Sequence, residues 1–261
     1  MSEAQKLPLE AWYQGRTLNF GHRGASYDAP ANTIPAFELA ADSGADGIEL
    51  DVMLSRDGVP VVIHDETVDS TTDGHGPVSG FTLAELKALD AGGYKGPQYA
   101  GARIPTLEEV FEAVGQRLLI NIELKGLSAR ADGLEAQVAG LIARHGMDAR
   151  VIISSFNPIR LRRFRQAAPH IPIGFLHMPQ TPLPLRWLLG ALLIGLPREA
   201  DHPQQTAVTA SYLARMHAQG QRVNTWVVND PARMAALRDL GVDLIMTDRP
   251  DVLRGVLSGG Q

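Results

Sequence analysis

The sequence predicts an α/β protein with a (β/α)8 barrel fold, and three observations support this prediction. Short apolar strands alternate with amphipathic helices along the chain. About eight strand-helix units fit within the 261 residues, an ordinary size for such a barrel. The runner-up, a doubly wound open sheet, would carry the motif G-x-G-x-x-G after its first strand, and residues 21–26 read GHRGAS instead.

The first strands and helix lie in the N-terminal quarter of the chain. Residues 18–20 predict a short strand that ends at the GHRG turn. Residues 33–43 predict a helix because their apolar side chains recur at helical spacing, and Asn32 is expected to cap it. Residues 47–54 and 59–63 predict two strands joined by a turn that contains an Asp-Gly pair.

Regular alternation resumes after a long irregular segment. Residues 65–103 are rich in Gly, Thr and Pro, and a loop of this length inside a compact domain is unusual and often functional. The further predicted strands are residues 118–124, 151–154, 173–176, 222–228 and 244–247, and the further predicted helices are residues 83–89, 107–114, 134–145, 159–168, 208–219, 231–240 and 251–257.

Composition excludes several classes of protein. The chain is 44% hydrophobic, which is enough for a full core. Its net charge is -5 and it has no block of Lys and Arg, so we expect no nucleic-acid partner. The absence of cysteine excludes disulfides, thiolate metal sites and cysteine nucleophiles. Residues 1–18 are polar and lack the apolar core of a signal peptide, so a cytoplasmic location is expected.

The most apolar segment, residues 183–196, is too short to span a bilayer, which takes roughly 20 apolar residues. Two interpretations of it remain. The favoured one is a buried helix or loop of the barrel. The other is an exposed apolar lip that accepts acyl chains or makes peripheral contact with lipid or a membrane.

A pair of carboxylates lies in the predicted strand at residues 47–54. Glu49 and Asp51 are two residues apart, so both side chains point to the same side of the strand, and Ile48 and Leu50 point to the other. Two carboxylates facing a barrel interior would repel each other and lose hydration unless a cation paired with them. Hard cations such as Mg²⁺ and Ca²⁺ prefer oxygen ligands. The alternative is an edge strand with solvated acids.

The next main strand repeats the pattern, with Asn121, Glu123 and Lys125 on one face. Glu123 would supply a third carboxylate to the cation. Lys125, nearer the strand end, would hold an anionic group of a substrate. The alternative for these two residues is a structural Glu-Lys ion pair.

Two histidines lie at predicted strand ends, where a barrel carries its chemistry. His22 follows the first strand, and His64 ends the strand after the Asp-Gly turn. Histidine titrates near neutral pH, so the pair offers a general acid and a general base. Arg23 has the forked geometry that suits phosphate oxygens, and its alternative role is an ion pair with a neighbouring carboxylate.

These residues sit in a longer pattern that resembles the glycerophosphodiester phosphodiesterases. The resemblance runs from about residue 18 to residue 257 and is most specific in the N-terminal third. It rests on residues 21–26 (GHRGAS), 30–33 (PANT), Phe37, 46–52 (DGIELDV), 57–58 (DG), 61–65 (VVIHD), 71–74 (TTDG), 104–107 (IPTL) and 121–125 (NIELK), and more weakly on 154–156 (SSF), 224–226 (NTW), Asn229 and 243–250 (DLIMTDRP).

The resemblance implies a fold, a reaction and a set of roles. The fold is one (β/α)8 TIM-barrel domain at residues 18–257 with a small inserted subdomain at residues 65–103, after the second strand. The reaction is metal-dependent hydrolysis of a small glycerophosphodiester to an alcohol and sn-glycerol 3-phosphate, a step of lipid and glycerol metabolism. The implied roles are acid-base catalysis for His22 and His64, ligation of Mg²⁺ or Ca²⁺ for Glu49, Asp51 and Glu123, phosphate binding for Arg23 and Lys125, and a border of the glycerol pocket, or plain barrel packing, for Trp226.

One position departs from the family pattern. The family usually has Glu before Asn-Thr, and this chain has Ala31. The change removes an acid near the expected site and bears on metal affinity or preference.

Several alternatives stay open. The nucleophile is either water or a glycerol hydroxyl, which would form a cyclic phosphate. A lysophospholipase D-type enzyme would act on lysophospholipids through residues 183–196. A binder that does not cleave is disfavoured because both histidines are present, and a phosphodiesterase for phosphoinositides or sphingolipids is disfavoured by the strand with Glu123 and Lys125. The sequence assigns neither the alcohol nor an oligomeric state.

Overall fold

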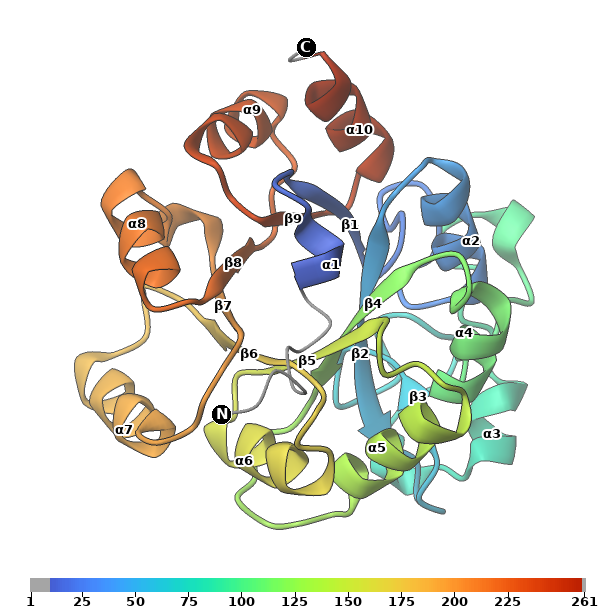
Figure 1. Cartoon of the computed structure of the whole chain (residues 1–261). Coiled ribbons are helices and arrows are strands. Elements are labelled where there is room, and N and C mark those ends of the chain that lie inside the picture. The colour runs from blue at the N-terminus through green and yellow to red at the C-terminus, as the bar shows by residue number, and fades with distance from the viewer. Residues whose placement is uncertain (1–9, 260–261) are drawn as a thin grey trace.

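The computed structural model describes residues 10–259, which form a closed barrel ringed by helices (Figure 1). Of the nine strands in this range, eight are parallel, and β1 pairs with both β9 and β2 to close the ring. The predicted (β/α)8 barrel is confirmed. Its strands are β1 (Leu18–His22), β2 (Gly47–Leu54), β4 (Leu119–Leu124), β5 (Val151–Ser155), β6 (Ile173–His177), β7 (Ala200–Pro203), β8 (Arg222–Thr225) and β9 (Leu244–Thr247).

Helices cover the outside of the barrel, because one face of each strand carries apolar side chains (Figure 1). Ile48 and Leu50 of β2 are fully buried in one cluster with Val110 and Phe111 of the neighbouring helix. The helices are α1 (Glu10–Tyr13), α2 (Ile34–Asp42), α3 (Leu83–Ala88), α4 (Leu107–Val114), α5 (Leu134–Arg144), α6 (Pro158–Ala167), α7 (Leu183–Leu193), α8 (Ala210–Ala218), α9 (Pro231–Leu240) and α10 (Pro250–Ser258), with short 3-10 turns at Val78–Gly80, Pro97–Tyr99 and Gln205–Ala207.

Strand register determines which polar side chains meet inside the barrel. Glu49 of β2 pairs with His22 of β1 on one side and with Asn121 of β4 on the other. Asp51 pairs with Glu123. Paired residues of neighbouring strands point to the same face of a sheet, so these side chains share the barrel interior.

Two strand predictions need correction. The predicted strand at 59–63 is β3 (Pro60–Val62), which pairs antiparallel with the end of β2 and lies outside the parallel ring. The barrel strand missing from the prediction is β7. Its sequence, Ala-Asp-His-Pro, shows no apolar alternation. All four residues are nevertheless buried, because Asp201 contacts His177 and His202 contacts Asn224.

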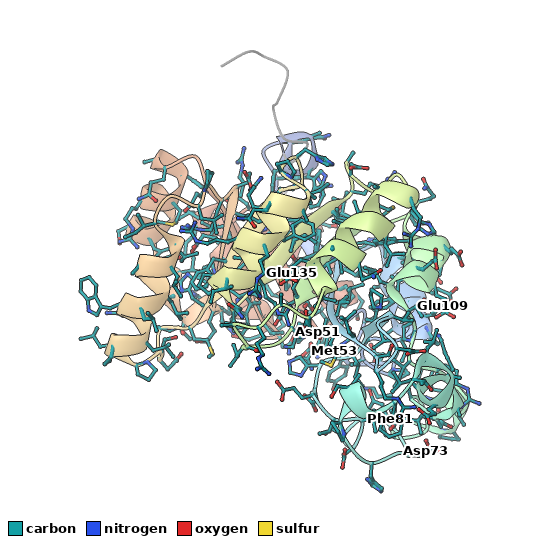
Figure 2. All side chains as sticks on the ribbon, turned by 90° about the horizontal axis from the view of Figure 1, so that it is seen from below. Asp51, Met53, Asp73, Phe81, Glu109 and Glu135 are labelled. Carbon is teal, nitrogen blue, oxygen red and sulfur yellow. The ribbon has the colours of Figure 1, made fainter. Side chains whose placement is uncertain are left out.

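Residues between β3 and α4 build a small apolar cluster of their own. Val68, Val78, Leu86 and Ala91 are buried in it together with Val61 of β3. Figure 2 shows Asp73 and Phe81 in this segment, which projects from the end of the barrel where Asp51 lies. The domain limits 18–257 and the insertion limits 65–103 stay predictions.

The apolar segment around Trp187 forms helix α7, and the favoured interpretation of a buried element is wrong. No side chain from Leu183 to Leu193 is buried. Trp187 is 74% exposed and Ile194 is 75% exposed. Only Leu189 and Leu193 pack partly against the main core.

Within residues 10–259, no helix is both long enough and apolar enough to cross a membrane. The expected cytoplasmic location depended partly on residues 1–9, which lie outside the described residues, and it stays a prediction.

Candidate active site

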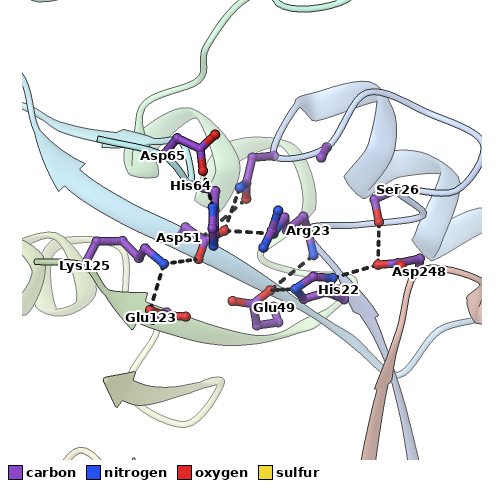
Figure 3. Close-up of polar contacts among 12 residues, drawn as sticks. His22, Arg23, Ser26, Glu49, Asp51, His64, Asp65, Glu123, Lys125 and Asp248 are labelled. Atoms are coloured by element: carbon purple, nitrogen blue, oxygen red, sulfur yellow. Dashed lines mark hydrogen bonds and ion pairs between the residues drawn. The ribbon is translucent and has the colours of Figure 1, made fainter. Parts of the chain in front are cut away.

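Three buried carboxylates converge at the end of the barrel where β2 and β4 finish. Glu49 and Asp51 come from β2 and Glu123 from β4, and one oxygen of each lies within 4.8 Å of the others. All three side chains are buried. Figure 3 shows them close together, with His64 and Arg23 beside Asp51, Lys125 beside Glu123, and His22 beside Glu49. The predicted set of ligands is therefore together in space.

The electrostatics of the three acids differ. Burial, with repulsion from Asp51 and Glu123, raises the pKa of Glu49 well above its usual range. Burial and the Asp51 charge likewise raise the pKa of Glu123, to about 7. Burial also opposes ionisation of Asp51, but the nearby Lys125 and Arg23 charges outweigh it and lower the pKa of Asp51. The site thus holds more potential negative charge than its own cations neutralise.

Lys125 is the closest cation to the carboxylates. Its Nζ lies 3.0 Å from Glu123 Oε1 and 3.5 Å from Asp51 Oδ1. Burial disfavours the charged amine, yet Asp51 and Glu123 outweigh burial and raise the pKa of Lys125. The Glu-Lys pair considered from the sequence is present, and it places an ammonium group beside the candidate cation site.

Arg23 reaches the site because the backbone after β1 turns sharply. Arg23 has φ +55° and Gly24 has φ +85°. A Cβ at residue 24 would lie 2.6 Å from the backbone of Ala36, so the turn requires glycine there. The Arg23 backbone N–H donates to the Glu49 carbonyl at 2.9 Å, and its Nε lies 3.3 Å from Asp51 Oδ2.

Asn32 has a role that the sequence did not predict. The N-cap of α2 is Thr33, so the expected capping role of Asn32 is wrong. Asn32 instead adopts φ +59°, and its amide donates to Asp51 Oδ2 at 2.8 Å. Because the Asn32 side chain is hydrogen-bonded to Asp51, it does not cap helix α2. The PANT motif was the signal that could have pointed to this contact.

His22 is held by an aspartate from the other end of the chain. Its Nδ1 lies 2.7 Å from Asp248 Oδ1, and its Nε2 lies 3.9 Å from Glu49 Oε2. Ser26 and Asn229 also donate to Asp248, at 2.9 Å and 2.6 Å. Burial disfavours the Asp248 charge, but the His22 hydrogen bond and charge outweigh it and lower the pKa of Asp248 to about 2. Asp248 lay in the DLIMTDRP motif without an assigned role.

His64 has a similar partner next to it in sequence. Its Nδ1 lies 2.6 Å from Asp65 Oδ1, and Ser70 also donates to Asp65. Burial lowers the pKa of His64, and attraction to Asp51 only partly offsets this. Hydrogen bonds from Ser70 and His64 lower the pKa of Asp65, which stays ionised at neutral pH. Both histidines therefore direct Nδ1 to a carboxylate, and Nε2 is the second ring nitrogen of each.

Two further residues singled out from the sequence are Trp226, which follows β8, and Ala31, which lies beside the site. The Trp226 Nε1–H donates to the His202 carbonyl at 2.8 Å, and its ring meets Phe156 edge to face with centroids 5.5 Å apart. These contacts fit either role predicted for Trp226. Ala31 lines a small cavity that Arg23 and His64 also line, and its N–H donates to the Tyr94 hydroxyl at 2.9 Å.

The donor set suits a hard divalent cation. Three buried carboxylates offer oxygen ligands, and burial together with mutual repulsion raises the pKa of Glu49 and Glu123. Two histidines and two cationic side chains surround the same point (Figure 3). Acids, bases and phosphate-binding groups in this arrangement can cleave a phosphodiester.

Known proteins support this chemistry. The model of the glycerophosphoryl diester phosphodiesterase family matches residues 22–252. The chain is 42% identical over 246 residues to a protein of Caldanaerobacter subterraneus named glycerophosphodiester phosphodiesterase, covering 94% of this chain and 99% of that protein. A protein of the same name from Bacillus altitudinis is 39% identical over 239 residues, covering 90% and 96%.

Solved structures have the same fold. A phosphodiesterase of Oleispira antarctica, in complex with the product sn-glycerol-3-phosphate, superposes with a TM-score of 0.80 at 31% identity and covers 95% of this chain and 99% of that one. A glycerophosphodiester phosphodiesterase of Agrobacterium tumefaciens superposes with a TM-score of 0.76 at 33% identity, covering 92% and 99%.

Proposed function

Since the chain belongs to the glycerophosphoryl diester phosphodiesterase family, whose members are phosphodiester hydrolases, we propose that it hydrolyses glycerophosphodiesters to an alcohol and sn-glycerol 3-phosphate with the help of Mg²⁺ or Ca²⁺. The observation that carries this proposal is the convergence of three buried carboxylates beside two histidines. The bound product named for the Oleispira antarctica relative supports the choice of substrate.

Glu49, Asp51 and Glu123 would hold the cation. When bound, a divalent cation neutralises phosphate charge and stabilises the charge that develops in the transition state. Arg23 and Lys125 contact the same carboxylates in the described structure and would turn to non-bridging phosphate oxygens once a cation takes over the carboxylates. Trp226 would border the glycerol moiety.

His22 and His64 would move the protons. The hydrogen bonds to Asp248 and Asp65 set Nδ1 as a donor in each ring, so Nε2 either takes or gives a proton. One histidine removes a proton from the nucleophile, and the other protonates the leaving alkoxide. The new bond joins the nucleophile oxygen to phosphorus, and the broken bond joins phosphorus to the alcohol oxygen. The nucleophile is water, or it is the glycerol hydroxyl; in the second case a cyclic phosphate forms first, and water then opens it to sn-glycerol 3-phosphate.

A coupled assay of glycerol 3-phosphate release tests the proposal. The full chain is mixed with several glycerophosphodiesters, with Mg²⁺, with Ca²⁺ or with a chelator. We expect release that requires a cation. Activity that survives exhaustive chelation would contradict the role of the three carboxylates, and cleavage of phosphoinositides or sphingolipids alone would contradict the substrate class.

Two variants test the histidines. His22→Ala and His64→Ala should each lower kcat by about 10²–10⁴, the usual contribution of general acid-base catalysis. His170→Ala is the matched control, because His170 pairs with Asp148 on the exposed surface. Near-wild-type turnover by either of the first two variants would refute their catalytic role.

A further inference from the structure

A cavity of about 680 Å³ lies at the end of the barrel opposite the candidate active site. Thr17, Asp46 and Asp243 line it, and they directly precede strands β1, β2 and β9. His22 ends β1 and Asp248 follows β9, so the candidate catalytic groups lie at the other ends of these strands. The volume is within the range of roughly 300–1,000 Å³ that is usual for small-molecule pockets. We call this cavity the basal cavity.

Arginines give the basal cavity an excess of positive charge. Among the described residues, the charged side chains that line it, apart from histidine, are Arg16, Arg222, Arg238, Arg254, Asp46 and Asp243. Arg16 donates to both oxygens of Asp46, at 2.9 Å and 2.7 Å, and Arg222 donates to Asp243 at 3.0 Å. Arg238 pairs with Asp239, which does not line the cavity. The lining is therefore positive, although the whole chain has a net charge of -5.

Arg254 supplies the charge that no acid neutralises. Its Nη1 donates to the Ser43 carbonyl at 3.2 Å, and within residues 10–259 it forms no ion pair with a carboxylate. The chain makes room for this guanidinium, because a Cβ at Gly44 would lie 2.5 Å from Arg254 Nη1. A guanidinium group carries five N–H donors, and its planar fork matches the oxygens of a phosphate. An arginine held in this way on the wall of a cavity favours an anionic ligand.

Asn19 adds a hydrogen-bond acceptor to the same cavity. It lines the cavity and is only 2% exposed. Its Nδ2 donates to the Pro250 carbonyl at 2.8 Å, whereas its buried Oδ1 has no hydrogen-bond partner among the described residues. A buried amide oxygen normally accepts a hydrogen bond. A hydroxyl group can supply one, so the ligand should carry hydroxyls as well as negative charge.

We propose that the basal cavity binds a phosphate ester of a sugar or polyol. Arg254 binds the phosphate, Arg16 and Arg238 add N–H donors that their carboxylate partners do not use, and a hydroxyl of the ligand donates to Asn19 Oδ1. This site is separate from the proposed reaction and goes beyond it, since no step of the hydrolysis involves it.

The alternative is a network of ion pairs that only stabilises this end of the barrel, the usual role of the end at which the strands begin. Such a network would match each charge with an opposite one and satisfy its buried polar atoms. Arg254 and Asn19 both depart from that pattern, and both line the same cavity. The two observations together favour a ligand.

The first test compares three probes by isothermal titration calorimetry of the full chain. Ribose 5-phosphate carries both phosphate and hydroxyls, methyl phosphate carries only the phosphate, and ribose carries only hydroxyls. A chelator is present so that the buried carboxylates of the candidate active site hold no cation. Ribose 5-phosphate should bind with a Kd of about 100 μM or below, at least about tenfold more tightly than either of the other probes. No binding of ribose 5-phosphate, or equal binding of methyl phosphate, overturns the proposal.

The second test places the binding site with variants. Arg254→Gln should raise the Kd of ribose 5-phosphate at least about tenfold, because charge-assisted hydrogen bonds are lost. Arg144→Gln is the matched control, since Arg144 is an exposed helical arginine that does not line the cavity. Equal effects of these two variants overturn the proposal. Binding that survives Arg254→Gln and is lost in Lys125→Gln assigns the probe to the candidate active site and also overturns it.

A further variant keeps the proposal testable if Arg254→Gln folds poorly by circular dichroism. Arg16 is half exposed, so Arg16→Gln should fold, and Asp46 would then face the cavity without its partner. The added negative charge should weaken ribose 5-phosphate binding at least about tenfold. An unchanged Kd in Arg16→Gln places the ligand away from the basal cavity and overturns the inference.

Discussion

Replacement of Glu123 by glutamine should stabilise the protein when no divalent cation is bound. Glu123 is buried, and the charge of Asp51 repels it, so its pKa rises from 4.5 to about 7 while Lys125 offsets only part of the effect. Glutamine keeps the shape and can still accept from Lys125, but it carries no charge to desolvate. The variant should therefore lose metal binding and gain stability.

The size of the effect follows from the pKa. A raised pKa means that the folded state holds more protons than the unfolded state, so stability falls as pH rises from about 4.5 to about 7. At 1.36 kcal/mol per pH unit, ionised Glu123 costs about 3 kcal/mol above pH 7 and nothing well below pH 4.5. For a chain of this length that is about 6 °C in Tm.

Urea and thermal unfolding of the two proteins in chelator, at about pH 5 and pH 8, measure this cost. The advantage of Glu123→Gln should appear at the higher pH and shrink at the lower one. Added Mg²⁺ or Ca²⁺ should stabilise the wild type more than the variant, because only the intact site binds tightly. Glu112→Gln is a control of equal charge change on the exposed side of α4.

Two results would refute this reasoning. One is a Glu123→Gln protein that is no more stable than the wild type in chelator at the higher pH. The other is an advantage that does not depend on pH, since it would have a source other than the ionisation of Glu123.

Three other perturbations have defined outcomes. Asp248→Asn should lower kcat by about 10²–10⁴ with little change in KM, because an amide can present its N–H to His22 and hold the wrong tautomer; steady-state kinetics with an unchanged kcat would rule out this positioning role. Ala31→Glu should tighten binding of Mg²⁺ or Ca²⁺ by about tenfold, since carboxylate number tunes cation affinity. Calorimetry that finds an equal or larger Kd would contradict this expectation. Arg160→Met should cost about 3 kcal/mol in urea unfolding, because Glu135 stays buried without its 3.0 Å partner; a loss below about 1 kcal/mol, the range of surface pairs, would show that Glu135 finds another partner or water.

The sequence predicted much of the site because strand geometry is local. Alternation along β2 and β4 placed Glu49, Asp51 and Glu123 on inward faces, and the register of the two strands brings them together. Helices such as α4 and α9 begin and end at the predicted residues. The spacing of apolar and polar residues along a strand or helix can be recognised within a few residues of the chain.

The sequence did not predict the contacts between side chains that lie far apart in the chain. Asp248 holds His22 across 226 positions, and no local pattern links them. Asn32 looked like a helix cap because Asn competes for helix ends, but contact with Asp51 decided its conformation. Strand β7 lacks apolar alternation, and its polar residues are buried only because other strands and α8 supply partners.

Sequence by itself determined the alternation of strands and helices and the chemical character of the centre, because both depend on spacing of two or of three to four residues along the chain. Only the tertiary structure decided which apolar segments are buried against other parts of the protein. Helix α7 is the clearest case, since its composition indicates burial and its position at the rim of the barrel leaves its side chains exposed. Burial depends on what lies opposite a side chain, and that is set by the closure of the whole barrel.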